Sequence, residues 1–540
     1  MSTRREKKDP APDQRQDRVK IRQLATGVPG LDEILGGGLP EYSFNILAGA
    51  PGSGKTTLAH QIMFANASAT NPALYFTVLG EPAIKMLRYQ QQFAFFDQSR
   101  MHGPNAAIRF VNLSRLVLEK DLGAVLDEII KQVEATHAGI VVVDSFRTVV
   151  RKAQSEAAAG KTSEMELQGF IQRLALHLTS WQATTFLIGE YVEGEIRDNP
   201  VFTVADGMLW LYQSVERNSI VRKMQVMKIR GQESVPGLHT FRITGAGVHT
   251  FPRTFGLSLE SGHVKGKVRV STGIAKLDEM LHGGIPEGES LLLAGPSGAG
   301  KSTLGMHFID DGLRRGEPGI VAIFEELPIE HVHRARMFGI DFVKPQKDGK
   351  LKLIYLRPLD LSVDETVHEI VKSVKEIGAR RLVIDSLVGF EMALAPGFRE
   401  DFRESLYRMI AALTRLGVTI VSTVEVEEDF TSMNLSKFTV SFLADDILRM
   451  RYVSINGQLR RMLMVVKMRR SPHSIDMHEY QITGKGLVIG EPLRGYRGLT
   501  SGIPEPWSVE SGQNDPKLRQ GRPPKPAPKP RRTHRGRKDD

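Results

Sequence analysis

Two glycine-rich segments share the pattern G-x-x-x-x-G-K-[ST], a residue pattern suited to holding phosphate groups. Each follows a short apolar stretch typical of a buried strand and opens a helical pattern, so backbone N–H groups and a helix N-terminus converge on one anion. The candidate phosphate-binding residues are Gly49, Ala50, Pro51, Gly52, Ser53, Gly54, Lys55, Thr56 and Thr57 in the first segment and Gly295, Pro296, Ser297, Gly298, Ala299, Gly300, Lys301, Ser302 and Thr303 in the second.

Within each segment, the lysine and the following hydroxyl residue have separate expected roles. Lys55 and Lys301 are expected to bridge the β- and γ-phosphates of a nucleotide. Thr56 and Ser302 are expected to ligate Mg²⁺ through their hydroxyl groups. The sequence therefore predicts two sites for ATP with Mg²⁺.

An aspartate ends a strongly apolar stretch in both halves of the chain. Asp144 follows IVVV and Asp385 follows RLVI. Alone, such an aspartate would be interpreted as a cap of the following turn. At the same place relative to a phosphate-binding segment in both halves, it is the expected carboxylate partner of Mg²⁺.

Two adjacent carboxylates, Glu325 and Glu326, follow another apolar stretch of the second half. A carboxylate at this place can accept a proton from water or from a hydroxyl group, so both are candidate catalytic residues. When the shared prolines Pro82 and Pro328 are aligned, residues 79–81 of the first half read Leu-Gly-Glu. The pair is absent there, and the two sites are expected to differ in chemistry.

The chain contains an internal repeat. The segment beginning at Thr26 recurs 246 residues later, and residues 226–231 recur 239 residues later as 465–470. Several matched blocks in the same order indicate a duplicated domain.

Each copy alternates short apolar stretches with longer amphipathic ones. Residues 139–145 and 184–190 are typical of buried strands, whereas residues 122–135 carry apolar residues at helical spacing. The alternation predicts an α/β fold with a mostly parallel central sheet flanked by helices. Late in each copy, β-rich stretches without a long helix between them predict antiparallel strands that extend the sheet.

Charge and composition place the domain boundaries. We expect a disordered basic tail at residues 1–23, a first domain at 24–254, a second domain at 255–500 and a disordered Pro/Arg/Lys-rich tail at 501–540. Residues 1–23 carry a net charge of +4 and residues 515–540 one of +7, which leaves −1 for the body. A solvated, disordered extension is the commoner meaning of such a stretch, so nucleic acid stays open as a partner only through the basic tail.

Composition excludes several classes of site. The chain has no cysteine, which excludes disulfides, thiolate metal sites and a cysteine nucleophile. No run of 18 apolar residues could cross a bilayer, and the charged N-terminus lacks the apolar segment of a signal peptide. We expect a cytoplasmic protein without a membrane partner.

Taken together, the TG-x₃-LDE block, the glycine-rich segment, the strand-ending EE, the IDS strand and a late K-x-R resemble the circadian clock ATPase family KaiC. The resemblance covers about residues 19–490. It implies two tandem RecA-like P-loop NTPase domains, a homo-oligomer in the form of a double-ring hexamer with ATP at subunit interfaces, and regulatory protein partners.

The resemblance also assigns the late K-x-R motif, which in such rings reaches the phosphates of the neighbouring subunit. The corresponding residues are Lys228, Arg230, Lys467 and Arg469, with His473 close behind. Without the resemblance, these residues would be interpreted as solvated charges on an edge strand.

The chain departs from the family at the expected phosphoacceptors. The clock protein has adjacent Ser and Thr shortly before a strand-leading Asp, and alignment on Asp445 gives Ser441-Phe442 here. A two-site phosphorylation cycle is not expected, whereas a single autophosphorylation at Ser441, or nearby at Thr439, stays open.

Three functions remain in view. The leading hypothesis is an oligomeric ATPase, with or without serine/threonine autokinase activity, that signals its nucleotide state to partner proteins. The alternatives are a RecA-related ATPase that acts on DNA, as a recombinase or helicase, and a module that uses ATP only for assembly. No aromatic and basic stripe typical of a single-strand channel accompanies the near-neutral body.

Overall fold

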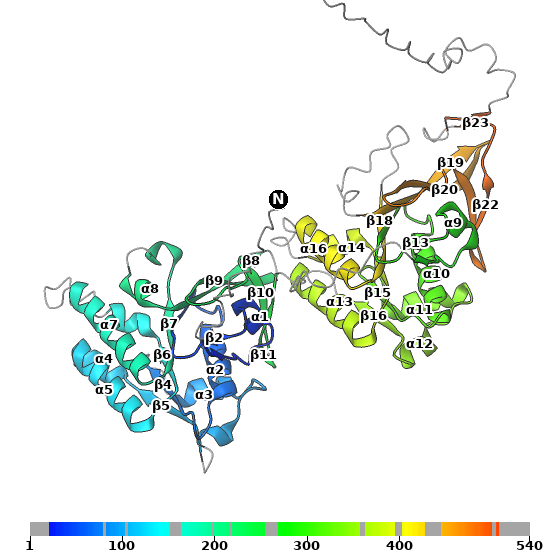
Figure 1. Ribbon diagram of the computed structural model, residues 1–540. Helices are drawn as coiled ribbons and strands as arrows, with labels where there is room; N and C mark the ends of the chain where they lie inside the picture. The colour runs from blue at the N-terminus through cyan, green and yellow to red at the C-terminus, as the bar shows by residue number, and fades with distance from the viewer. Residues whose placement is uncertain are drawn as a thin grey trace, which may run out of the picture.

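The computed structural model shows two α/β domains, each built on a nine-stranded sheet (Figure 1). The residues that the structure describes are 21–78, 83–102, 106–151, 164–196, 199–216, 219–253, 268–356, 362–394, 402–426, 444–498 and 504–506.

The first sheet has the strand order β11-β10-β9-β8-β3-β7-β6-β4-β5. The six strands β8, β3, β7, β6, β4 and β5 run parallel. Strands β9, β10 and β11 continue the sheet beyond β8 as antiparallel strands. The strands are β3 (Phe44–Gly49), β4 (Ala73–Thr77), β5 (Ile108–Asn112), β6 (Ile140–Asp144), β7 (Thr184–Glu190), β8 (Gly207–Glu216), β9 (Ser219–Ile229), β10 (His239–Thr244) and β11 (Gly247–Phe251).

The second sheet repeats this plan, with the order β16-β15-β17-β18-β14-β19-β20-β21-β22. Its strands are β14 (Ser290–Gly295), β15 (Gly319–Ile323), β16 (Leu351–Tyr355), β17 (Arg381–Asp385), β18 (Thr419–Glu425), β19 (Asp446–Ile455), β20 (Gln458–Met468), β21 (His478–Thr483) and β22 (Gly486–Pro492). Strands β20 to β22 are again antiparallel, which confirms the expected extension of a mostly parallel sheet.

Helices cover both faces of each sheet. The first domain contains α1 (Leu31–Leu35), α2 (Lys55–Asn66), α3 (Ala83–Gln90), α4 (Ser114–Glu119), α5 (Leu122–Thr136), α7 (Glu164–Ser180) and α8 (Pro200–Val204). The second contains α9 (Ala275–Met280), α10 (Lys301–Arg314), α11 (Pro328–Met337), α12 (Val343–Lys347), α13 (Val363–Ile377), α14 (Leu387–Ala393) and α16 (Phe402–Arg415).

The strand β3 shows how one apolar stretch supplies two cores. Because successive side chains of a strand point to opposite faces, Ile46 packs in the cluster with α5 and α7, and Leu47 packs in the cluster with α2. Leu292 and Leu293 of β14 divide in the same way between two clusters of the second domain. The continuous apolar pattern thus reflects burial on both faces.

The TG-x₃-LDE block that begins each copy is a local hydrogen-bonded turn. The Asp32 carboxylate accepts hydrogen bonds from the Thr26 backbone N–H at 2.8 Å and from the Thr26 hydroxyl at 2.6 Å. Asp278 holds Thr272 in the same way, at 2.8 and 2.7 Å. This block therefore fixes the start of each domain rather than contributing to its phosphate site.

Short two-stranded pairs complete the fold. They are β1 (Gln23–Leu24) with β2 (Leu39–Pro40), β12 (Arg269–Val270) with β13 (Ile285–Pro286), and β23 (Tyr496–Arg497) with β24 (Glu505–Pro506). Gln23 belongs to the expected N-terminal tail and β24 to the expected C-terminal one, while residues 1–20 and 507–540 lie outside the described ranges. Among the described residues, no helix combines the length and apolar character that crossing a bilayer requires.

Candidate nucleotide sites

Each glycine-rich segment connects a fully buried central strand to a helix. β3 ends at Gly49 and α2 begins at Lys55, while β14 ends at Gly295 and α10 begins at Lys301. The residue before each helix, Gly54 in the first copy, has a left-handed φ of 100°, and a Cβ there would meet the Ile243 side chain at 2.5 Å. The left-handed conformation favours glycine at this position, and any other residue would also displace the end of the Ile243 side chain.

The two lysines lie over their own loops. The Lys55 Nζ donates a hydrogen bond to the Ala50 carbonyl oxygen at 2.8 Å. The Lys301 Nζ donates to the carbonyl oxygens of Gly295 and Pro296, at 2.9 and 2.8 Å. Burial lowers the pKa of both ammonium groups, although nearby carboxylates oppose this shift. Each lysine is therefore positioned at the loop centre, where phosphate oxygens would replace the carbonyls.

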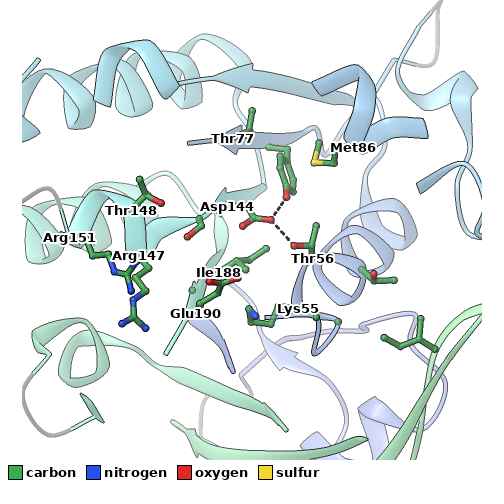
Figure 2. Close-up of a pocket in the computed structure, with 17 residues that line it drawn as sticks. Lys55, Thr56, Thr77, Met86, Asp144, Arg147, Thr148, Arg151, Ile188 and Glu190 are labelled. Carbon is green, nitrogen blue, oxygen red and sulfur yellow. Dashed lines mark hydrogen bonds between the residues drawn. The ribbon is translucent and has the colours of Figure 1, made fainter. Parts of the chain in front are cut away.

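Asp144 lies beside the hydroxyl that is expected to ligate Mg²⁺. Its Oδ2 accepts hydrogen bonds from the Thr56 hydroxyl at 2.8 Å and from the Tyr75 hydroxyl at 2.6 Å, and Figure 2 shows Asp144 facing Thr56. Burial raises the pKa of the Asp144 carboxyl, which the two hydroxyl donors and Lys55 oppose. A hydroxyl and a carboxylate at this separation are oxygen donors of the kind that Mg²⁺ prefers, so these residues fit the ion.

Asp385 occupies the same place in the second copy, at the end of β17. Its Oδ1 accepts a hydrogen bond from the Thr423 hydroxyl at 2.6 Å. Ser302, its expected partner at the metal, is the second residue of α10.

Glu325 and Glu326 follow β15 after Phe324 but have different partners. The Ser386 hydroxyl donates a hydrogen bond to the Glu325 Oε1, next to Asp385. The Glu326 Oε1 is 2.6 Å from the His331 Nδ1 and accepts a hydrogen bond from the Arg334 guanidinium. Glu325 is exposed, so of the two carboxylates it is the one open to water. In the first copy, residues 79–82 lie outside the described ranges.

The Glu326 carboxylate belongs to a group of possible metal ligands. Ligand atoms of Glu326, His331 and Asp385 all lie within 4.8 Å of one another. The Arg334 guanidinium already contacts Glu326 and lies 4.0 Å from the Asp385 Oδ2. Because the Arg334 guanidinium neutralises this group, we assign His331 and Arg334 to holding Glu326 rather than assigning a second metal to the group.

Sequence reasoning missed two acidic residues beside the loops. Glu190 ends β7 in register with Gly49, and Glu425 ends β18 in register with Gly295. Each carboxylate opposes the lowering of the pKa of the nearby lysine. A glutamate ends an apolar stretch in both copies, and this pattern in the sequence could have indicated the two residues. Only the strand order, however, places β7 and β18 next to the strands that lead into the glycine-rich loops.

The K-x-R residues lie away from the glycine-rich loops, toward the other end of the central strands. Lys228 is paired with Met208, which in turn is paired with Ile46, so it lies three residues before the end of β3, about 10 Å along the strand. The Lys228 Nζ donates to the Thr203 carbonyl oxygen at 3.2 Å, and the Arg230 Nη1 donates to the Asp206 Oδ1 at 3.0 Å.

The second copy has the same arrangement. The Lys467 Nζ donates to the Ala444 carbonyl oxygen at 2.9 Å, and the Arg469 Nη1 lies 3.6 Å from the Asp445 Oδ1. The His473 Nδ1 is 2.9 Å from the Ser474 carbonyl oxygen. The structure therefore does not bring these residues to the loop of their own domain. Ser441 and Thr439 lie outside the described residues.

A family model described as "ATPase: KaiC" matches residues 24–254 and again residues 270–494. The chain belongs to the KaiC ATPase family. Its two sheets are accordingly those of tandem RecA-like P-loop domains, and the suspected resemblance is confirmed.

Among curated relatives, the circadian clock oscillator protein KaiC of Picosynechococcus sp. is 27% identical over 496 residues, which cover 91% of this chain and 94% of the relative. Two Synechocystis proteins are similar to the same degree. Circadian clock oscillator protein KaiC 1 is 28% identical, with 91% and 94% covered, and circadian clock protein KaiC3 is 26% identical, with 90% and 95% covered.

Proposed function

We propose that this KaiC-family chain is an oligomeric ATPase whose nucleotide state is read by partner proteins, and that the second domain carries most of the turnover. Both domains are proposed to bind Mg·ATP. The observation that carries the proposal is the pairing of a positioned lysine with a strand-ending aspartate in both copies, joined in the second by the exposed Glu325.

The residues of the second domain divide the reaction among them. Lys301 holds the β- and γ-phosphates, and Ser302 and Asp385 would hold Mg²⁺. When bound, the ion supplies positive charge that polarises the γ-phosphate. Glu325 accepts the proton of the attacking water as the bond from that water oxygen to phosphorus forms, and ADP leaves with the electron pair of the broken P–O bond.

The position of the K-x-R residues supports a ring. Lys467 contacts the Ala444 carbonyl oxygen and Arg469 lies beside Asp445. Among the described residues, no hydrogen bond or ion pair joins either side chain to the loop before Lys301, which supports a phosphate site on another subunit. A closed ring of six copies with heterologous contacts is the proposed arrangement.

Phosphate release by P-loop variants tests this function. Lys301→Ala is expected to lower turnover about 100-fold, the range that positioned catalytic groups contribute, and Lys55→Ala to lower it by less than about threefold. Equal loss in both variants would contradict the division between domains.

Two further results would favour the alternatives. Stimulation of turnover by single-stranded DNA would favour the DNA-acting ATPase, and binding of ATP without any phosphate release would favour the assembly module. Both arms use the full chain.

A further inference from the structure

The phosphate pocket of the first domain extends beyond its P-loop. The pocket has a volume of about 450 Å³, and its lining runs from Lys55 and Thr56 past Asp144 to Arg147 and Arg151. Figure 2 shows both arginines on the other side of Asp144 from Lys55. The pocket therefore has cationic side chains at both ends, with a carboxylate between them.

Arg147 is held in place at the pocket wall. It lies in the helical turn 146–151, which follows Asp144 after Ser145. Its Nη2 donates a hydrogen bond to the Glu195 Oε1 at 2.6 Å, and its guanidinium carbon lies 5.2 Å from the centre of the Tyr191 ring. The side chain is only 17% exposed. An arginine fixed in this way loses little conformational freedom when it binds an anion.

The charges in the pocket explain what the arginines can do. Asp144 and Glu190 both face the region next to Lys55, and both act on the Lys55 ammonium electrostatically. Mg²⁺ held by Asp144 would offset the charge of that carboxylate, but the Glu190 carboxylate still repels an entering γ-phosphate, and further cations reduce this repulsion. Guanidinium groups match phosphate oxygens with two parallel N–H donors, so Arg147 and Arg151 can supply the attraction that the carboxylates oppose.

The second copy lacks these cations. Alignment of Asp144 with Asp385 places Val388 opposite Arg147 and Met392 opposite Arg151. The arginines are therefore not a requirement of the shared fold, because the duplicated domain forms without them.

We propose that Arg147 and Arg151 form a γ-phosphate subsite, which makes the first-domain site selective for nucleoside triphosphates over nucleoside diphosphates. The proposal rests on the proposed function, namely that the first domain binds Mg·ATP. ADP occupies the P-loop without a group that reaches the arginines, so their removal weakens the binding of ATP alone.

The test measures Mg·ATP and Mg·ADP affinity separately at the first site. The parent is the full-length chain with Lys301→Ala, which disables the second P-loop. Adding Arg147→Ala and Arg151→Ala together is expected to weaken ATP binding about tenfold or more and ADP binding less than about twofold, as measured by titration calorimetry.

Three further variants serve as controls. Arg115→Ala removes one positive charge from an exposed ion pair on α4, away from the pocket, and is expected to change neither affinity. Arg147→Lys keeps the charge but loses the two-donor geometry, so an intermediate loss of ATP affinity is expected. If the double variant fails to bind ADP, the ATP and ADP affinities are instead compared in the single variants Arg147→Lys and Arg151→Ala.

Two outcomes overturn the subsite: an equal loss of ATP and ADP affinity, or no loss of either. If the parent binds neither nucleotide at its first site, the proposed function itself fails for that domain, which is a distinct result from an unchanged preference.

Discussion

Glu325 and Glu326 are neighbours in the chain, but their carboxylates serve different partners. Glu326 is held by His331 and Arg334 on α11, whereas Glu325 lies beside Ser386 and is exposed. Two adjacent glutamates therefore divide into one that is open to water and one that is fixed. The sequence identified the pair but could not assign these roles, because the partners lie on α11 and after β17.

We predict that Glu325→Gln lowers phosphate release by at least about 100-fold, because it removes the proton acceptor. Glu326→Gln is expected to lower phosphate release less than about tenfold, because the amide keeps an oxygen that accepts the hydrogen bond from Arg334. Both are assayed at nucleotide saturation in the Lys55→Ala background, so that the second site alone is measured. A larger loss for Glu326→Gln would reverse the assignment.

Glu81 is the matching test for the first copy. If Glu81→Gln abolishes turnover in the otherwise native chain and the Glu325→Gln/Glu326→Gln double variant keeps it, the first domain carries the reaction instead.

Asp446 is a second residue whose surroundings change its chemistry, here the pKa of its carboxyl group. It is fully buried at the start of β19, and burial together with the Glu289 and Asp445 carboxylates raises the pKa of its carboxyl to about 7. Gly207 takes its place in the register of the first copy, so no such carboxyl occurs there.

The raised pKa predicts how stability depends on pH. The folded chain binds the Asp446 proton more tightly than the unfolded chain, so this stabilisation is complete below about pH 4 and is lost as the pH rises through about 7. Asp446→Asn stays neutral, and it should raise the free energy of unfolding at pH 8 by on the order of 2 kcal/mol relative to the parent.

Urea unfolding of the second domain at pH 5 and pH 8 measures this effect. Asp476→Asn, at an exposed position, is the control and should leave the pH dependence of the parent unchanged. Parallel pH profiles for Asp446→Asn and the parent would show that Asp446 does not titrate in this range.

At the scale of elements, the β10–β11 hairpin links the two domains. Ile243 of β10 lies against Gly54 of the first P-loop. The neighbouring Arg242 forms an ion pair with Glu365 in the first turn of α13, at 2.9 Å, and the Thr240 hydroxyl donates to Asp364 at 3.3 Å. One short strand therefore contacts the nucleotide loop of one domain and a helix of the other.

We predict that the Arg242–Glu365 pair contributes to the docking of the domains. Both side chains are about one-third exposed or less, so a double-mutant cycle with Arg242→Ala and Glu365→Ala should give a coupling energy of about 0.5–1 kcal/mol in thermal unfolding. The exposed Arg115–Glu119 pair, treated identically, should give less than about 0.5 kcal/mol. Equal coupling energies for the two pairs would exclude a special role at the interface.

Elements with a strong local pattern could be predicted from the sequence. The helix expected at 122–135 is α5, Leu122–Thr136, where the Asp121 side chain accepts a hydrogen bond from the Ala124 N–H. Glu190 and Arg147 could not be assigned in this way. The role of Glu190 depends on β7 lying next to β3, and that of Arg147 on a turn that returns its side chain to the pocket. Both relationships are tertiary, and no spacing in the chain encodes them.

At the scale of the whole molecule, duplication gives two copies of one fold with different sites. The first has Arg147 and Arg151 at its pocket, and the second has Val388 and Met392 at those positions and Glu325 at the end of a neighbouring strand. The shared residues are those that form the strands and the P-loop. The differing residues lie on the segments that follow the strands, where substitutions change the chemistry without disturbing a core.

The position of the K-x-R motif leads to the final prediction, which concerns the assembly. Lys467 lies level with Leu292 in the register of the second sheet, three residues before the end of β14, whereas Lys301 follows the loop beyond that end. If Lys467 acts on a phosphate, that phosphate is bound by a neighbouring subunit. Lys467→Ala should then lower turnover at least about tenfold, since it removes one charge-assisted contact, while Mg·ATP still binds to the P-loop of the same chain.

Mixing two kinds of variant subunit distinguishes action of Lys467 on a neighbouring subunit from action within its own chain. Lys467→Ala subunits and Lys301→Ala subunits are each nearly inactive, yet a mixed ring restores sites in which an intact P-loop meets an intact Lys467 from its neighbour. Turnover of the mixture should therefore exceed that of either variant alone, and light scattering in Mg·ATP should show an oligomer. A monomer at saturating Mg·ATP, or a mixture no more active than its components, would mean that each domain completes its own site.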